Sequence, residues 1–247
     1  MSRFLVFAFA FVMSAASNLA QETPAPGKQV ELMMSDDAGD VGFLMYLPQK
    51  YDADKNRSWP LMLFLHGRGE SNGPLSRVAQ HGPPKFAQRG DDLPFVLVSP
   101  QCPGDGWWSD DTRQEQLGRL LDTVTKSDRV DKNRIYLTGL SMGGYGSWSL
   151  AAKYPDRFAA VVPVCGGGDP KDADKLTSLP IWVFHGDQDR AVPFRKSVEM
   201  VEAIRDAGGT NIRFTSLEHV GHNCWSSAYA MPELYGWMLN QKASADD

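Results

Sequence analysis

Apolar residues gather along the chain in short runs that are separated by longer polar stretches. Most of these runs are apolar at nearly every position and rich in β-branched and aromatic residues. Such runs are typical of strands buried on both faces of a parallel sheet. Six lie at residues 61–65, 95–99, 134–139, 159–164, 181–185 and 212–217, and the segments 29–34 and 41–47 predict two antiparallel strands before them.

Helical periodicity appears between the strand-like runs. Four apolar residues between positions 117 and 124 repeat at i, i+3, i+4 and i+7 after Asp111, which we expect to cap that helix. A second apolar stripe, at positions 198–204, precedes Gly208, a residue that commonly ends helices. Alternating strands and helices predict one α/β domain: a doubly wound, mostly parallel sheet of about eight strands.

The N-terminal segment has the three parts of a secretory signal peptide. Arg3 precedes ten apolar residues at 4–13, and small residues continue to Ala20. The apolar run is too short to cross a bilayer, which needs about 20 residues, so no stable membrane insertion is expected. We predict a signal peptide at 1–20, cleaved near Ala20 or alternatively near Ala16, and hence a secreted or periplasmic protein. A tether at 21–28, a catalytic domain at 29–242 and a flexible tail at 243–247 would follow.

Composition narrows the functional classes. The formal net charge of −5 argues against a nucleic-acid-binding surface, which normally presents a basic face. Three cysteines allow at most one intramolecular disulfide, and none has the C-x-x-C spacing of a zinc or redox site. We therefore expect neither a metal site nor a nucleic-acid partner.

Reactive side chains follow several of the predicted strands. Ser141 lies in G-L-S-M-G after the run 134–139, and carboxylates follow His185 in H-G-D-Q-D. Histidines follow the last run, at positions 219 and 222. Since ligands bind beyond the carboxyl ends of parallel strands, these groups should share one edge of the sheet.

The context of Ser141 favours a nucleophile over a structural turn serine. A strand at 135–138 leads to it and a helix at 147–154 follows, as a nucleophile elbow requires. Flanking glycines avoid collisions with the neighbouring strand and helix in the strained turn. A serine hydroxyl also needs a base and an acid that orients the base, and they follow Ser141 here in the order carboxylate, histidine.

The stretches LFLHGRGE, SPQCP, GLSMGGYG, HGDQDRAVP and GHNCW resemble those of serine esterases of the α/β-hydrolase superfamily. The resemblance is closest to secreted bacterial polyhydroxybutyrate depolymerases and feruloyl or predicted peptidase-like esterases, and it covers residues 34–238. It implies Asp189 as the catalytic acid and His222 as the base. Asp187 and His219 are the competing candidates.

Backbone donors are expected to stabilise the negative charge that develops on the substrate oxygen. The residue after the serine, Met142, and the residue just past the third strand, Arg68, are the implied pair. The side chain of Arg68 is either solvated or in contact with an acidic substrate group. His66 and His185, which belong to H-G turns, are expected to stabilise those turns.

Three tryptophans are candidates for binding substrate. Trp107 and Trp108 either form an aromatic wall for an aryl or sugar ring or simply cover a loop. Trp225, close to His222, is a further candidate and is expected to support the histidine loop. In this fold two strands separate Cys102 from Cys165, so the expected disulfide, if one forms, joins Cys165 to Cys224.

Residues 165–180, where many hydrolases of this fold insert a helical cap, are too few to form one, so we expect an open site. The main hypothesis is a secreted serine carboxylic-ester hydrolase, without a cofactor, acting on short-chain, aryl (feruloyl-type) or polymer-displayed esters. The alternatives are a serine peptidase similar to the prolyl-oligopeptidase group and, from another class, a binding module that retains the scaffold without activity. The oligomeric state is left open.

Overall fold

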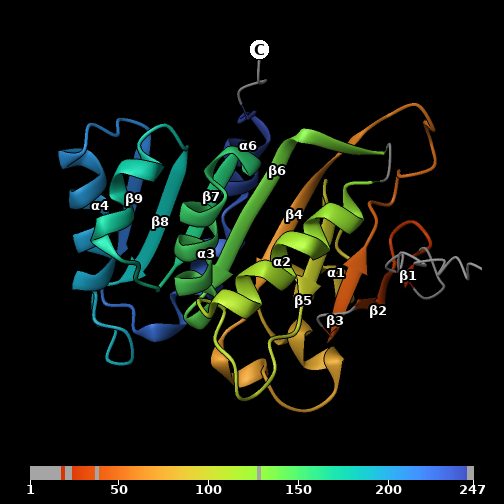
Figure 1. The fold of residues 1–247 in the computed structure, drawn as a ribbon, viewed down its shortest axis with the longest axis horizontal. Coiled ribbons are helices and arrows are strands. Elements are labelled where there is room, and N and C mark those ends of the chain that lie inside the picture. Colours follow the sequence, from red (N-terminus) through yellow and green to blue (C-terminus); the bar gives the residue numbers. More distant parts are fainter. Residues whose placement is uncertain (1–17, 20–23, 37–38, 127–128, 244–247) are drawn as a thin grey trace, which may run out of the picture.

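The computed structural model describes residues 18–19, 24–36, 39–126 and 129–243 (Figure 1). One mixed sheet runs through the molecule in the strand order β1-β2-β3-β5-β4-β6-β7-β8-β9. The strands are β1 (Asn18–Leu19), β2 (Gln29–Asp36), β3 (Gly39–Tyr46), β4 (Trp59–Leu65), β5 (Val96–Pro100), β6 (Val130–Leu140), β7 (Ala160–Val164), β8 (Ile181–Gly186) and β9 (Ile212–Leu217).

The six strands from β5 to β9 in spatial order pair in parallel, whereas β1, β2 and β3 pair antiparallel. This confirms the mostly parallel sheet and all eight predicted strands. The two-residue strand β1 is additional and falls within the predicted signal peptide, the rest of which lies outside the described residues.

Helices cover both faces of the sheet, which makes it doubly wound (Figure 1). One core lies under α2 (Asp111–Val124), α3 (Met142–Lys153) and α4 (Arg195–Asp206). The other lies under α1 (Gly82–Gln88), α5 (Trp225–Ala230) and α6 (Pro232–Leu239). Successive residues of β4 alternate between them, because side chains along a strand point to opposite faces. The sheet is therefore buried on both sides.

The three predicted helices are present, with corrections at two termini. Helix α3 begins at Met142, five residues before the predicted start at 147. Helix α2 begins at Asp111 itself and its N-cap is Asp110, so the expected cap was one residue too late. The stripe at 198–204 lies on α4, and Gly208 follows that helix with a positive φ of 95°. Glycine adopts this conformation without strain, which explains why the helix stops there.

The segment between β7 and β8 contains no cap domain. Its main element is a short 3₁₀ helix, Pro170–Leu176, which packs against α4 and α3. The carboxyl edge of the sheet is thus left open between these strands, as predicted. Among the described residues, no helix is both long and apolar enough to span a membrane.

Candidate active site

Ser141 occupies the sharp turn between β6 and α3. Its backbone is in a strained conformation with φ 52° and ψ −114°, which non-glycine residues rarely adopt. The turn projects the side chain from the edge of the sheet and starts α3 immediately afterwards. This is the geometry that the G-x-S-x-G motif predicts.

The glycines around Ser141 allow the turn to pack tightly against β4. A Cβ on Gly143 would lie 1.9 Å from the carbonyl oxygen of Leu65, and one on Gly139 would lie 2.4 Å from the carbonyl oxygen of Gly143. Neither contact is possible for a real side chain. The structure therefore confirms that these positions require glycine.

Ser141, His222 and Asp189 form one hydrogen-bonded chain. Ser141 Oγ lies 2.9 Å from His222 Nε2, and His222 Nδ1 lies 2.7 Å from Asp189 Oδ2. Ser141 follows β6, and the loops after β8 and β9 bring the acid and the imidazole to it past the end of β7, which lies between β6 and β8. This arrangement allows His222 to accept the serine proton while Asp189 holds the Nδ1–H tautomer.

Asp189 is held rigidly by its own loop. The carboxylate has no exposed surface, and its Oδ1 accepts hydrogen bonds from the N–H groups of Ala191 and Val192 at 2.9 Å. Burial alone would raise the pKa of this carboxyl, but the bonds from His222 and the two backbone donors outweigh it and hold the pKa below its usual value. Asp189 is therefore a carboxylate anion, which can pair with the His222 ring when that ring takes up a proton.

Asp187 and His219, the competing candidates for the acid and the base, make other contacts. Asp187 is exposed at the end of β8, and its backbone N–H pairs with Leu217. His219 is exposed too, and its Nδ1 contacts the side-chain amide of Gln188 at 3.2 Å. Neither residue joins the chain of hydrogen bonds that includes Ser141.

His185 contacts Asp189 of the hydrogen-bonded chain directly, which its position in an H-G turn did not indicate. Its Nε2 lies 3.2 Å from Asp189 Oδ2 and 3.1 Å from the carbonyl of Val192, and its Nδ1 lies 2.7 Å from Ser197 Oγ. Both neighbours of Nε2 are acceptors, so this nitrogen carries the hydrogen. Burial lowers the pKa of His185, which favours the neutral ring. His185 therefore supports Asp189 as a second hydrogen-bond donor, which the sequence did not reveal.

The two expected oxyanion donors are each the first residue of a helix. Met142 begins α3 and Arg68 begins a 3₁₀ helix, Arg68–Glu70, so their N–H groups have no acceptor within those helices. The loop with Arg68 runs beside the nucleophile, because a Cβ built on Gly67 would lie 3.7 Å from the Cβ of Ser141.

The Arg68 guanidinium is engaged by the protein itself. It donates to the carbonyls of Gly104 and Gly106 at 2.5 and 2.6 Å and lies 5.6 Å from the ring centre of Trp107. The side chain thus ties the 104–107 loop to the end of β4.

His66 fixes the peptide that carries the Arg68 N–H. Its Nε2 accepts from the Cys102 N–H at 2.9 Å, so the neutral ring has its hydrogen on Nδ1 and donates it to the Gly67 carbonyl at 2.6 Å. Burial lowers the pKa of His66 to about 4, which keeps the ring neutral. The Gly67 carbonyl and the Arg68 N–H belong to one peptide group, so His66 orients the expected oxyanion donor.

The three tryptophans have different environments. Trp108 is 2% exposed and donates from its indole to the His66 carbonyl at 3.0 Å, so of the two alternatives it covers the loop and does not form a substrate wall. Trp108 packs against Gly146 of α3, where a side chain in place of the glycine hydrogen would collide with it. Trp107 is 45% exposed, and the ring of Trp225 meets the His222 ring edge-on with centres 5.3 Å apart.

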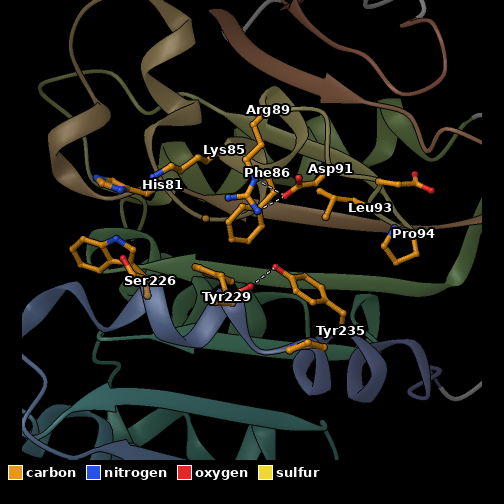
Figure 2. A pocket seen from close by; sticks show the side chains of 15 residues that line it. His81, Lys85, Phe86, Arg89, Asp91, Leu93, Pro94, Ser226, Tyr229 and Tyr235 are labelled. Carbon is orange, nitrogen blue, oxygen red and sulfur yellow. Dashed lines mark hydrogen bonds and ion pairs between the residues drawn. The ribbon is translucent and has the colours of Figure 1, made fainter.

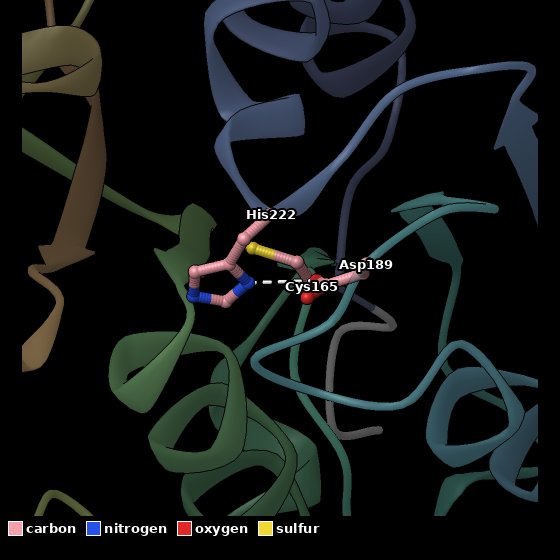
Figure 3. A group of neighbouring side chains, drawn as sticks. All are labelled: Cys165, Asp189 and His222. Carbon is pink, nitrogen blue, oxygen red and sulfur yellow. Dashed lines mark hydrogen bonds and ion pairs between the residues drawn. The ribbon is translucent and has the colours of Figure 1, made fainter.

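Cys165 lies against the acid and the imidazole (Figure 3). One donor atom each of Cys165, Asp189 and His222 lie within 4.8 Å of one another. The direct 2.7 Å bond between Asp189 and His222 leaves no space for an ion between them, and burial keeps the thiol protonated by raising its pKa well above the usual value. The group fits a hydrogen-bonded site better than a metal centre.

The cysteines do not form the expected disulfide. Cys102, Cys165 and Cys224 are all free thiols in the buried interior, although Cys224 is a neighbour of Cys165. The suggested Cys165–Cys224 bond is therefore absent.

Comparison with known proteins identifies the family of the chain. The family model described as "Putative esterase" matches residues 38–173, more than half of the chain. A bifunctional acetylxylan esterase/xylanase of Neocallimastix patriciarum is 28% identical over 152 residues, which is 60% of this chain and 22% of that protein. The "Probable feruloyl esterase C" of Aspergillus niger is 28% identical over 198 residues, 74% of this chain and 67% of that protein.

Among solved structures, a thermostable esterase superposes with a TM-score of 0.77 at 28% identity, covering 88% of this chain and 64% of that one. The chain spans less than half of the length of the first curated relatives that it matches, between 22% and 41%. The segment 38–173 that the family model matches includes the turn at Ser141 and the loop that carries Arg68.

Proposed function

We propose that this chain, which belongs to the esterase family, is a carboxylic-ester hydrolase and acts as a serine esterase through Ser141, His222 and Asp189. The observation that carries this proposal is the continuous hydrogen-bonded chain of the three residues, which starts from a serine held in a strained turn. A serine hydroxyl becomes a useful nucleophile near neutral pH only when such a base is in contact with it.

The proposed reaction has two halves. Ser141 Oγ attacks the ester carbonyl carbon while its proton passes to His222 Nε2, and the N–H groups of Arg68 and Met142 stabilise the oxyanion. His222 then gives the proton to the leaving alcohol, and the acyl group stays on Ser141. A water molecule, deprotonated by His222, releases the acid and restores the serine.

The substrates proposed are short-chain, aryl (feruloyl-type) or polymer-displayed esters. Names among the relatives support this range, since they include an acetylxylan esterase and a feruloyl esterase. The short segment between β7 and β8 supports it too, because an uncapped site admits an ester that is attached to a large chain. Trp107, exposed in the 104–107 loop that Arg68 holds, is the candidate for contact with an aryl acyl group.

The proposal includes export. The sequence pattern of residues 1–20 supports removal of a signal peptide and a protein that acts in the periplasm or the medium. N-terminal sequencing of the protein recovered from those fractions should read from residue 21, or from residue 17 if the alternative site is used. Recovery of residue 1 from the cytoplasm alone would contradict this part.

The decisive test compares the purified protein with Ser141→Ala on para-nitrophenyl acetate, methyl ferulate and a matched amide. We expect ester hydrolysis that falls by about 10⁴-fold or more in the variant, and fluorophosphonate labelling of Ser141. More than a few per cent residual activity in Ser141→Ala would refute the nucleophile. Amide turnover comparable with ester turnover would favour the peptidase alternative, and failure of labelling together with carbohydrate binding would favour a binding module.

A further inference from the structure

Glu70 is a buried carboxylate that the mechanism described above does not use. It ends the 3₁₀ helix Arg68–Glu70, its side chain is 6% exposed, and its Oε2 has no hydrogen-bond partner among the described residues. Burial raises the pKa of this carboxyl above its usual value. A carboxylate is costly to bury, and titratable groups with shifted pKa values gather at functional sites. Glu70 is therefore a candidate for a role in the reaction.

The carboxylate packs against Gly67, the residue before the expected oxyanion donor. A Cβ built on Gly67 would lie 3.2 Å from Glu70 Oε2 and 3.7 Å from the Cβ of Ser141. The carboxylate and the nucleophile thus both lie beside the same short piece of backbone. The Gly67 N–H faces the carboxylate and favours its ionised form.

Other side chains hold the remaining polar groups of this backbone. In the peptide group between residues 66 and 67, the carbonyl accepts from the Trp108 indole at 3.0 Å. In the next peptide group, the Gly67 carbonyl accepts from the His66 ring at 2.6 Å and from the Glu70 N–H at 3.3 Å. The Arg68 N–H of that second peptide group begins a helix and has no acceptor within it. The orientation of this N–H therefore depends on how the two peptide groups are held.

Two imidazoles and a guanidinium surround the Glu70 carboxylate. His66 Nδ1 lies 4.0 Å from Oε2, His81 Nε2 lies 3.8 Å from Oε1, and the charge of Arg77 acts to lower the pKa of the carboxyl. Figure 2 shows His81 at one end of a cleft of about 570 Å³ between α1 and α5, where its ring lies 5.4 Å from that of Trp225. These contacts, together with burial, restrict the carboxylate to its place beside Gly67.

We propose that Glu70 is a positioning residue for ester hydrolysis: its carboxylate accepts the Gly67 N–H and so keeps the Arg68 N–H directed at the oxyanion. The inference rests on the proposed serine esterase function and adds a residue to it. Glu70 acts through the two peptide groups and does not touch the substrate. Loss of the acceptor would let Gly67 rotate, which weakens a contact that matters most in the transition state, so kcat should fall and KM should change little.

Two substitutions of similar size separate orientation from packing. Glu70→Gln keeps an oxygen acceptor, whereas Glu70→Met fills the same space without one. Removal of a whole oxyanion donor lowers kcat by about 10² to 10³-fold, so displacement of the donor in Glu70→Met should lower kcat on para-nitrophenyl acetate by at least about tenfold. Glu70→Gln should stay within about threefold of wild type, with KM within about threefold in both variants.

Asp131→Leu is the matched control. Asp131 lies at the end of β6 opposite Ser141 and pairs with Arg134, so loss of this partly buried carboxylate should leave kcat within about twofold of wild type. Urea unfolding of each variant shows that the folded protein is being compared. A wild-type kcat in Glu70→Met, equal losses in the two Glu70 variants, or a loss confined to KM would overturn the assignment.

A second measurement does not depend on the choice of ester. The phosphoryl oxygen of a fluorophosphonate uses the same oxyanion donors, so the rate constant for labelling Ser141 should fall in Glu70→Met by at least about tenfold, as kcat does. Labelling of Glu70→Met at the wild-type rate would overturn the inference and leave the serine esterase proposal intact. No labelling of Ser141 in the wild-type protein would instead refute the proposed function, on which the inference rests.

Discussion

Asp187 and Asp189 are two residues apart, yet their surroundings are opposite. The Asp189 carboxylate is fully enclosed and bonded to His222, whereas Asp187 is exposed at the strand end. Only a group that receives the Nδ1–H of His222 can hold the imidazole in its reactive tautomer. The same reasoning separates His222 from the exposed His219.

Asp189→Asn should lower kcat by about 10³ to 10⁴-fold, because an amide stabilises the wrong tautomer and leaves the imidazolium without a counter-charge. Asp187→Asn is the matched control and should stay within twofold of wild type. Steady-state kinetics on para-nitrophenyl acetate, with circular dichroism to verify folding, would check this. Equal losses in both variants would remove Asp189 from the proposed role.

His66 makes folding stability depend on pH. Its pKa is about 4 in the folded protein against an ordinary value of 6.5, so the unfolded chain binds a proton more readily than the folded one. The free energy of unfolding should therefore fall as the pH drops from about 6.5 to about 4, by about 3 kcal/mol from this residue. Urea unfolding of wild type and His66→Gln across that range measures it; an equally steep decline in the variant would contradict it.

At the residue scale, a motif revealed the reactive groups but not the residues that support them. The G-x-S-x-G motif indicated Ser141, and the resemblance to serine esterases indicated Asp189 and His222 over Asp187 and His219. The contacts of His66 and His185 depend on which carbonyl or carboxylate folds against each ring, and H-G turns carry no such information. Trp108 shows the same limit, since paired tryptophans look alike in sequence and only one of them is buried.

At the scale of elements, the strand β6 and the helix α3 meet β4 closely because Gly143 has no side chain. Gly143→Ala should destabilise the protein by several kcal/mol or prevent folding, since its Cβ would lie 1.9 Å from the backbone oxygen of Leu65. Gly236→Ala is the contrasting variant: its Cβ would have open space on α6, and it should stabilise that helix by up to about 1 kcal/mol. Thermal unfolding of both variants would check this, and a harmless Gly143→Ala would refute the close approach.

Strands were easier to predict than helices for a physical reason. A strand buried on both faces has an apolar residue at nearly every position, and that pattern is visible in a single sequence. The helices α1, α5 and α6 have 6 to 8 residues, and α1 has two prolines in its first turn, so no stripe of several turns marks them. Their positions come from packing on the sheet, so the sequence analysis did not predict these three helices.

At the scale of the whole molecule, the described residues place no cap over the edge of the sheet where Ser141 lies. In a hydrolase with a lid over the active site, the lid must open before substrate can reach the nucleophile. The rate of hydrolysis of para-nitrophenyl butyrate should instead rise hyperbolically with the concentration of the ester, with no jump where that concentration exceeds the solubility limit. A sharp rise in rate above that limit would indicate a closing element, and addition of a non-ionic detergent would distinguish it from substrate aggregation.

The conformation of Ser141 lowers the stability of the fold. A φ of 52° costs a serine about 1 to 3 kcal/mol that a glycine would not incur. Ser141→Gly should therefore unfold at a higher temperature than Ser141→Ala, which retains the strain; equal melting temperatures would show that the turn is relaxed. A glycine at position 141 would relax the turn but would have no group that could attack an ester, so the strain is the stability cost of the proposed nucleophile.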